Sequence, residues 1–120
     1  MKHVYLNLKR FDIPAALGGV NRLADVGDWG GEIIRRTQDR LAAYSPDQVE
    51  FVMYFPEAHL LNAARARGEN SPIQLGCQGV YREDTAIGGN FGAFTTQRTA
   101  HAALELGCES VLIGHCEERN

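Results

Sequence analysis

The chain has 120 residues, of which 12 are basic and 15 acidic, with a formal net charge of −3 and a pI near 5.8. This length predicts a single domain, and the scattered charge forms no basic patch of the kind that binds nucleic acid or an anionic membrane. No apolar run is long enough to span a bilayer or to form a signal-peptide core, so we expect a cytoplasmic protein with neither a nucleic-acid nor a membrane partner.

Strand and helix patterns alternate along the chain. In chain order we predict a strand over residues 3–9, a helix over 32–44, a strand over 49–55, a helix over 58–67, a strand over 73–80, a helix over 97–106 and a strand over 110–115. Short runs of β-branched and aromatic residues indicate the strands, while apolar residues three or four positions apart indicate the helices. This alternation implies βαβ crossovers and therefore a parallel sheet in an α/β protein.

Capping residues mark the expected helix ends. Asp28 is a candidate N-cap for the first helix, and Thr95 and Thr96 are candidates for the third. Gly68 and Gly107 follow the second and third helices, at the position where glycine commonly ends a helix.

Two long connections, residues 11–29 and 82–94, interrupt the alternation. Each follows a strand, so both should lie at the rim where α/β proteins place their chemistry. The glycines of the second connection, Gly88, Gly89 and Gly92, are not followed by the Gly-Lys-Ser/Thr ending of a nucleotide-binding loop, which favours a flexible turn over a phosphate cradle.

Four parallel strands by themselves would leave the first and the last strand as open edges. The same four units would be stable as the first half of a closed eight-stranded barrel, which typically needs about 250 residues. We therefore expect a (β/α)8 barrel of which about the first four β/α units are present, with residues 1–120 as the amino-terminal half of one domain.

Polar residues at the end of the first predicted strand are candidates for binding an anion. Side chains alternate along a strand, so Tyr5, Asn7 and Lys9 should share one face, with Asn7 and Lys9 at its carboxyl end. An amide and an ammonium aimed into one pocket can hold a negatively charged oxygen. The alternative is that Lys9 projects into solvent from the strand end.

The last predicted strand runs directly into His115 and Glu117, which should lie on a common side. A histidine at a strand end can be a structural hydrogen-bonding residue, but a helix starting next to it would favour its neutral, proton-donating form. Gln78, at the end of the third strand, either orients the rim by hydrogen bonds or only terminates the strand.

Cysteines and histidines give no sign of a disulfide framework or a metal site. The three cysteines, Cys77, Cys108 and Cys116, include no Cys-x-x-Cys pair, which favours reduced thiols. His3, His59 and His101 are dispersed without metal-ligand spacing. We expect no metal site.

Several short motifs resemble, in order, the amino-terminal half of triosephosphate isomerase. They are Asn7-Leu8-Lys9, the run from Gly76 through Gln78 to Asp84, Gly92-Ala93-Phe94-Thr95, and Ile113-Gly114-His115-Cys116-Glu117. The resemblance touches all four predicted strands and implies the fold of a TIM barrel. It also implies an intramolecular oxidoreductase that interconverts glyceraldehyde 3-phosphate and dihydroxyacetone phosphate through an enediolate, without a cofactor.

Residue roles are inherited from this resemblance. Lys9 would bind the substrate phosphate and offset the enediolate charge, and Asn7 would position the first loop and the substrate. His115 would be the neutral electrophile that polarises the carbonyl, with Glu117 as its acidic support. Gln78 is a further supporting candidate. Phe94 and Thr95 would lie at the loop tip that reaches a second subunit, which implies a homodimer.

The sequence also departs from the family pattern. Residues 11–29 replace a short first loop, and the third loop carries extra residues before Gly92. Gln97 and Glu118 stand where the family commonly has a glutamate and an arginine, and Cys116 stands in place of a serine. The opposite-charge pair of the family therefore cannot form from these two positions.

Three hypotheses remain open from the sequence. The first is an intact isomerase of which these residues are half; the second is a non-catalytic or divergent barrel that binds a sugar phosphate; the third is an inactive half-barrel fragment. The family's general base, a glutamate on the sixth strand, has no counterpart in the 120 residues. Since proton abstraction needs a base within reach, we expect the chain alone to be inactive.

Overall fold

The structure is a computed structural model of the whole chain and describes residues 1–89 and 91–114. In chain order its elements are β1 (Lys2–Asn7), a 3-10 turn (Ala15–Leu17), α1 (Val26–Leu41), β2 (Val49–Phe55), a 3-10 turn (Glu57–His59), α2 (Leu60–Ala66), β3 (Ile73–Cys77), a 3-10 turn (Phe91–Ala93), α3 (Ala100–Glu105) and β4 (Cys108–Val111). Among the described residues, no helix is both long and apolar enough to cross a membrane.

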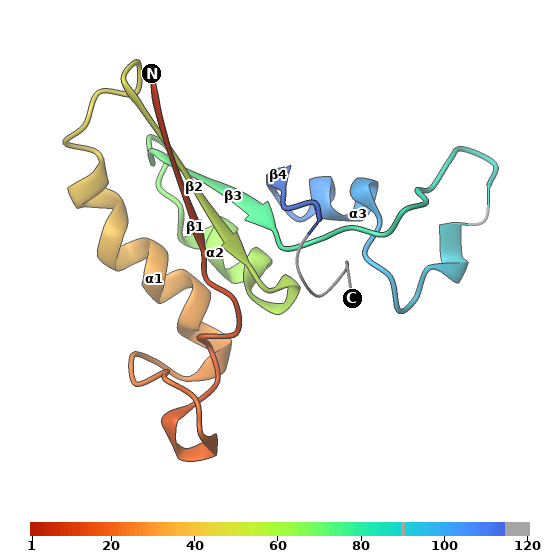
Figure 1. Cartoon of the computed structure of the whole chain (residues 1–120), viewed down its shortest axis with the longest axis horizontal. Coiled ribbons are helices and arrows are strands. Elements are labelled where there is room, and N and C mark those ends of the chain that lie inside the picture. Colours follow the sequence, from red (N-terminus) through yellow and green to blue (C-terminus); the bar gives the residue numbers. More distant parts are fainter. Residues whose placement is uncertain (90, 115–120) are drawn as a thin grey trace.

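The strands form one parallel sheet in the order β1-β2-β3-β4, and Figure 1 shows this succession together with the flanking helices. The predicted α/β class and parallel sheet are confirmed, and the arrangement is that of the first units of a (β/α)8 barrel. β1 lies at one edge of the sheet and is exposed along nearly its whole length, as expected for an open edge.

The register assigns the side chains to two faces. Asn7, Tyr54, Gly76 and Ser110 form one row across the four strands, while the preceding row of Leu6, Met53, Leu75 and Cys108 points to the opposite face. The second row belongs to the side on which the helices pack.

The hydrophobic core lies between that second face and the helices. Its fully buried members include Phe55 on β2, Ile73 and Leu75 on β3, Leu60 on α2 and Ile34 on α1. Truncating any one of these to alanine would cost about 2–5 kcal/mol. The core therefore fixes the helix layer, and the row that contains Asn7 is left facing away from it.

Three strand ends differ from the sequence prediction. β1 stops at Asn7 instead of residue 9, because the chain turns at Lys9, which has a positive φ of 46°. β3 stops at Cys77 instead of residue 80, so Gln78 lies just beyond the strand. β4 is shifted to Cys108–Val111 from the predicted 110–115, and its pairing with β3 changes register between Leu75 and Gly76.

Helix α1 begins at Val26, six residues before its predicted start, and its N-cap position is Asp25 rather than Asp28. The early turns contain Gly30 and Gly31, whose low helix propensity concealed them in the sequence. Both are buried because α2 and the 3-10 turn before it approach closely: a Cβ on Gly30 would lie 2.8 Å from the Cβ of His59 in that turn. Packing, rather than propensity, therefore extends this helix.

Helix α3 begins at Ala100, so the prediction of a start at residue 97 with a cap at Thr95 or Thr96 is wrong. Thr99 is the N-cap, and its side chain accepts a hydrogen bond from Ala102 N–H at 3.2 Å. The preceding residue, Arg98, is held outside the helix because its carbonyl accepts from Tyr81 N–H at 2.6 Å.

The glycines of α1 give a matched test of this packing. Gly30→Ala should destabilise the chain by about 2 kcal/mol, because the new methyl overlaps His59. A Cβ on Gly27, in the same helix, would meet nothing within 4 Å, so Gly27→Ala should be neutral or stabilise by up to about 1 kcal/mol. Urea denaturation of both variants checks this, and equal midpoints would contradict the packing explanation.

Candidate active site

The carboxyl ends of β1 and β3 meet through the side chain of Gln78. Its Nε2 donates to Asn7 Oδ1 at 3.1 Å, to the carbonyl of Lys9 at 3.0 Å and to the carbonyl of Tyr54, at the end of β2, at 3.4 Å. An amide nitrogen has only two hydrogens for these three acceptors, so one is shared. One side chain thus joins the ends of three strands.

Lys9 has a strained backbone that is held from both sides. Its positive φ of 46° lies in the left-handed region, which costs a residue with a side chain about 1–2 kcal/mol. The Lys9 N–H donates to Asn7 Oδ1 at 3.0 Å, while its carbonyl accepts from Gln78. Strain that the surroundings enforce in this way is concentrated at functional sites in proteins.

Lys9 lies at the carboxyl end of the sheet, as predicted, but in a turn and not in the strand. The sequence prediction placed Lys9 on the same strand face as Tyr5 and Asn7, but the strand has already ended. The direction of the Lys9 stem is set by the turn that Asn7 and Gln78 impose, and the residue is exposed. The structure therefore brings together Asn7, Lys9 and Gln78 by tertiary hydrogen bonds rather than by strand alternation.

Tyr54 and Ser110 lie in the same row as Asn7 and are joined by a hydrogen bond. The Tyr54 hydroxyl oxygen and the Ser110 hydroxyl oxygen are 2.8 Å apart. The Tyr54 ring packs edge to face against Tyr5, with 6.2 Å between the ring centroids. Gly76 leaves room for that ring, since a Cβ there would come within 2.5 Å of Tyr54 Cδ1. The hydrogen bond between Tyr54 and Ser110 fixes β2 relative to β4 near the carboxyl ends of the strands.

The first long loop is anchored by a buried carboxylate that the sequence pattern did not reveal. Asp12 Oδ2 accepts from His59 Nε2 at 2.7 Å and from an Arg10 guanidinium nitrogen at 2.8 Å. Asp12 and His59 are each at most 2% exposed, and Trp29 covers the His59 ring at 4.9 Å. Because Arg10 directly follows Lys9, this cluster fixes the loop at the point where it leaves the rim.

The same loop is closed by the side chain of Asn21. Its Nδ2 donates to the carbonyls of Asp12 and Ala24, and its Oδ1 accepts from the N–H of Leu23. The predicted connection over 11–29 is therefore shorter, ending where α1 begins, and it is folded by buried polar contacts.

The long loop that follows β3 leads away from the sheet towards α3, as Figure 1 shows in cyan. Phe94 is half-buried and its ring contacts Tyr81 at 5.7 Å, whereas Thr95 is exposed. At the base of this loop, the backbone N–H groups of His101 and Thr85 donate to Asp84 Oδ1. The His101 contact, followed by the Thr85 contact, lowers the pKa of the Asp84 carboxyl.

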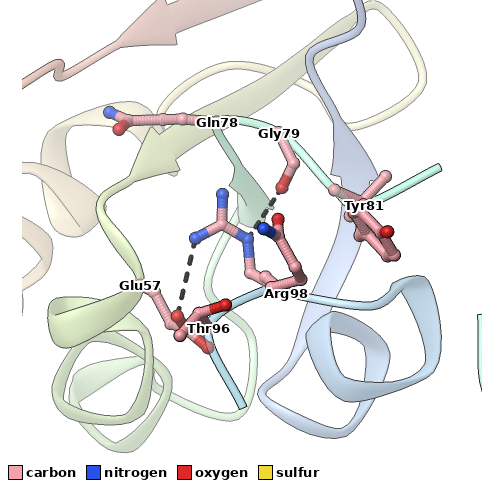
Figure 2. Close-up of a pocket in the computed structure, with 8 residues that line it drawn as sticks. Glu57, Gln78, Gly79, Tyr81, Thr96 and Arg98 are labelled. Carbon is pink, nitrogen blue, oxygen red and sulfur yellow. Dashed lines mark hydrogen bonds and ion pairs between the residues drawn. The ribbon is translucent and has the colours of Figure 1, made fainter. Parts of the chain in front are cut away.

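Arg98 lies between the loops that follow β2 and β3. Its Nε donates to the carbonyl of Gly79 at 2.7 Å, and its guanidinium forms an ion pair with Glu57 at 3.7 Å. Figure 2 shows both contacts inside a polar cavity of about 350 Å³ that Gln78 and Tyr81 also line. No sequence motif pointed to Arg98, because its partners lie 19 and 41 positions away in the chain.

Two buried cysteines lie on neighbouring strands, Cys77 at the end of β3 and Cys108 at the start of β4. The Cys77 thiol donates to the Ser110 carbonyl at 3.9 Å. The neighbouring Cys108 thiol lowers the pKa of Cys77, an effect to which the nearby positive charge of Arg98 adds. The contact with Cys77 raises the pKa of Cys108. Both of these thiols are free.

Two predicted site residues, His115 and Glu117, lie outside the described residues, as does the predicted strand end at 115. Within residues 1–89 and 91–114, no three His, Cys, Asp or Glu side chains are grouped as a metal site would require. The described geometry thus joins the Asn7 side chain and the Lys9 backbone through Gln78.

Comparison with known proteins gives a consistent result. A family model described as triosephosphate isomerase matches residues 30–120, more than half of the chain. The triosephosphate isomerase of Alkaliphilus metalliredigens (strain QYMF) is 41% identical over 71 residues, which are 59% of this chain and 26% of that protein. That of Acidithiobacillus ferrooxidans is 30% identical over 98 residues, which are 78% of this chain and 36% of that protein.

A third relative, the triosephosphate isomerase of Bdellovibrio bacteriovorus, is 37% identical over 68 residues. The chain spans between 26% and 36% of the length of these relatives. The parallel α/β sheet is consistent with the amino-terminal part of a TIM barrel, and the family match begins within α1 and includes β2, β3 and β4. The chain belongs to the triosephosphate isomerase family.

Proposed function

We propose that residues 1–120 form the amino-terminal half of a single TIM-barrel domain whose intact form is a triosephosphate isomerase. It would interconvert glyceraldehyde 3-phosphate and dihydroxyacetone phosphate through an enediolate, as a cytoplasmic homodimer without a cofactor. The observation that carries the proposal is the hydrogen-bonded set of Asn7, Lys9 and Gln78, with Lys9 held at a positive φ.

The proposed chemistry assigns a separate task to each group. The Lys9 ammonium binds the substrate phosphate and offsets the negative charge that develops on the enediolate oxygen. Asn7, whose Oδ1 already accepts from Lys9 N–H and Gln78, keeps its Nδ2 for the substrate. His115 would polarise the carbonyl as a neutral donor, with Glu117 supporting it. Gln78 has no direct contact with substrate in this proposal and keeps Lys9 and Asn7 in register.

Two elements of the proposal come from the rest of the barrel and from a second subunit. The base that removes the carbon-bound proton would be supplied by the remaining strands, since the reaction needs such a group within hydrogen-bond reach. Phe94 and Thr95 would contact the partner subunit. The exposure of Thr95 and the projection of its loop from the sheet support this assignment.

A chimera tests the proposed function. The full 120-residue chain would be fused to the part of the Acidithiobacillus ferrooxidans relative that follows its matched segment, and isomerisation of glyceraldehyde 3-phosphate would be measured. We expect turnover from the chimera and none from either piece alone. The relative's own two parts, rejoined at the same junction, serve as the matched control for the fusion.

The alternatives give different results in the same experiment. A folded chimera that binds a phosphorylated hydroxamate analogue of the enediolate without turnover would favour a non-catalytic sugar-phosphate barrel. A folded chimera that neither binds the analogue nor turns over substrate, beside an active rejoined control, would contradict the proposed function.

A further inference from the structure

Arg98 contacts the segments that follow β2 and β3, next to the residues of the candidate site. Its side chain is only 19% exposed, and its guanidinium connects Gly79, just after β3, with Glu57, just after β2. The Arg98 carbonyl also accepts from Tyr81 N–H at 2.6 Å. Arg98 therefore holds the segment after β3 with both its side chain, at Gly79, and its backbone carbonyl, at Tyr81.

The bond to Gly79 is the step that connects Arg98 with Lys9. The Gly79 carbonyl lies one residue beyond Gln78, so fixing it restrains the short backbone segment that carries Gln78. Gln78 in turn donates to Asn7 Oδ1 and to the Lys9 carbonyl. A charge-assisted hydrogen bond at 2.7 Å is among the stronger contacts available for this purpose.

Figure 2 shows that Arg98 and Gln78 do not face each other. The guanidinium points towards Gly79 and Glu57, whereas the Gln78 side chain points away from the guanidinium. Arg98 therefore acts on Gln78 through the backbone rather than by a side-chain contact. The Glu57 ion pair is long at 3.7 Å and Glu57 is half exposed, so the Gly79 bond is the stronger of the two.

We propose that Arg98 is a positioning residue of the active site, which holds Gln78 and thereby sets the turn at Lys9. The proposal rests on the proposed isomerase function for its kinetic consequence, but its structural step concerns the described residues only. It predicts that the effect of Arg98 on activity depends on the presence of Gln78.

A double-mutant cycle in the chimera tests the kinetic consequence. Arg98→Met should lower kcat/KM about tenfold, a size typical of residues that hold a catalytic group in place. In a Gln78→Ala background, the same change should lower kcat/KM by less than about twofold, because Arg98 can no longer act on Lys9 and Asn7 through Gln78. Arg65→Met, an exposed arginine on α2, is the matched control and should leave activity unchanged. Effects that multiply in the double variant would overturn the proposal.

Nuclear magnetic resonance of the 120-residue chain tests the structural step without any activity. The side-chain amide signal of Gln78 should move towards the shift of a free amide in Arg98→Met and stay in place in Arg65→Met. Arg98→Lys keeps the charge but loses the planar donor, so it should move the Gln78 signal in the same direction while preserving the overall fold. An unchanged Gln78 signal in both Arg98 variants would overturn the proposal.

The two arms separate the possible failures. An inactive chimera combined with a shifted Gln78 signal would contradict the proposed function and leave the positioning step supported. An active chimera whose Arg98 and Gln78 effects multiply would support the function and contradict the positioning role.

Discussion

Lys9→Met in the active chimera is expected to lower kcat/KM about 10²–10³-fold, the usual consequence of removing one group that stabilises a developing oxyanion. Methionine is an unbranched side chain only one heavy atom shorter than lysine, so it keeps most of the aliphatic stem and removes the charge. The free energy of unfolding should therefore change by less than about 0.5 kcal/mol. Steady-state kinetics and urea denaturation of the same variant measure the two quantities.

The chain contains a matched control for this change. Of its two lysines, Lys9 lies two residues beyond the carboxyl end of β1, whereas Lys2 is the first residue of that strand and lies away from the rim. Lys2→Met removes the same charge from the opposite end of β1 and should leave kcat/KM within about twofold. A similar loss of activity in both variants would indicate a general effect of charge and would contradict the assigned role of Lys9.

Asp12→Ala is expected to destabilise the chain by about 3 kcal/mol, the upper end of the cost of leaving a buried hydrogen-bonding group without its partner. Asp12 is 1% exposed, and its loss would leave His59 buried without its 2.7 Å acceptor. It would also release the Arg10 guanidinium next to Lys9. The first loop should therefore loosen at the point where it meets the rim.

Fluorescence of Trp29 during urea denaturation measures this effect locally. Trp29 is the single tryptophan of the chain and packs on the His59 ring. Asp39→Ala, an exposed aspartate on α1, is the control and should change stability by less than about 0.5 kcal/mol. Equal unfolding midpoints for the two variants would contradict the structural role of the buried pair.

Elements whose burial follows local pattern were predictable. β2 has its predicted limits, 49–55, because it lies inside the sheet and five of its residues are buried, which gives a continuous apolar run. α2 begins two residues later and ends one residue earlier than predicted, after a 3-10 turn at Glu57–His59. In these segments the chain's own periodicity and burial agree.

Elements whose limits depend on distant partners were not predictable. β1 ends early because Gln78, 71 positions away, and Asn7 hold Lys9 in a turn. α3 starts late because Arg98 is bonded to Gly79 and Tyr81, so Thr99 and not Thr95 becomes the cap. Neither contact leaves a periodic trace in the sequence.

The sequence by itself determined the parallel α/β fold and the family, because strand and helix periodicity and short motifs are local properties of the chain. Only the tertiary structure decided how Asn7, Lys9 and Gln78 meet, and that Asp12 and Arg98 brace the loops around them. The physical reason is that hydrogen bonds between strand ends join residues far apart in the chain, and their geometry exists only after the sheet has formed.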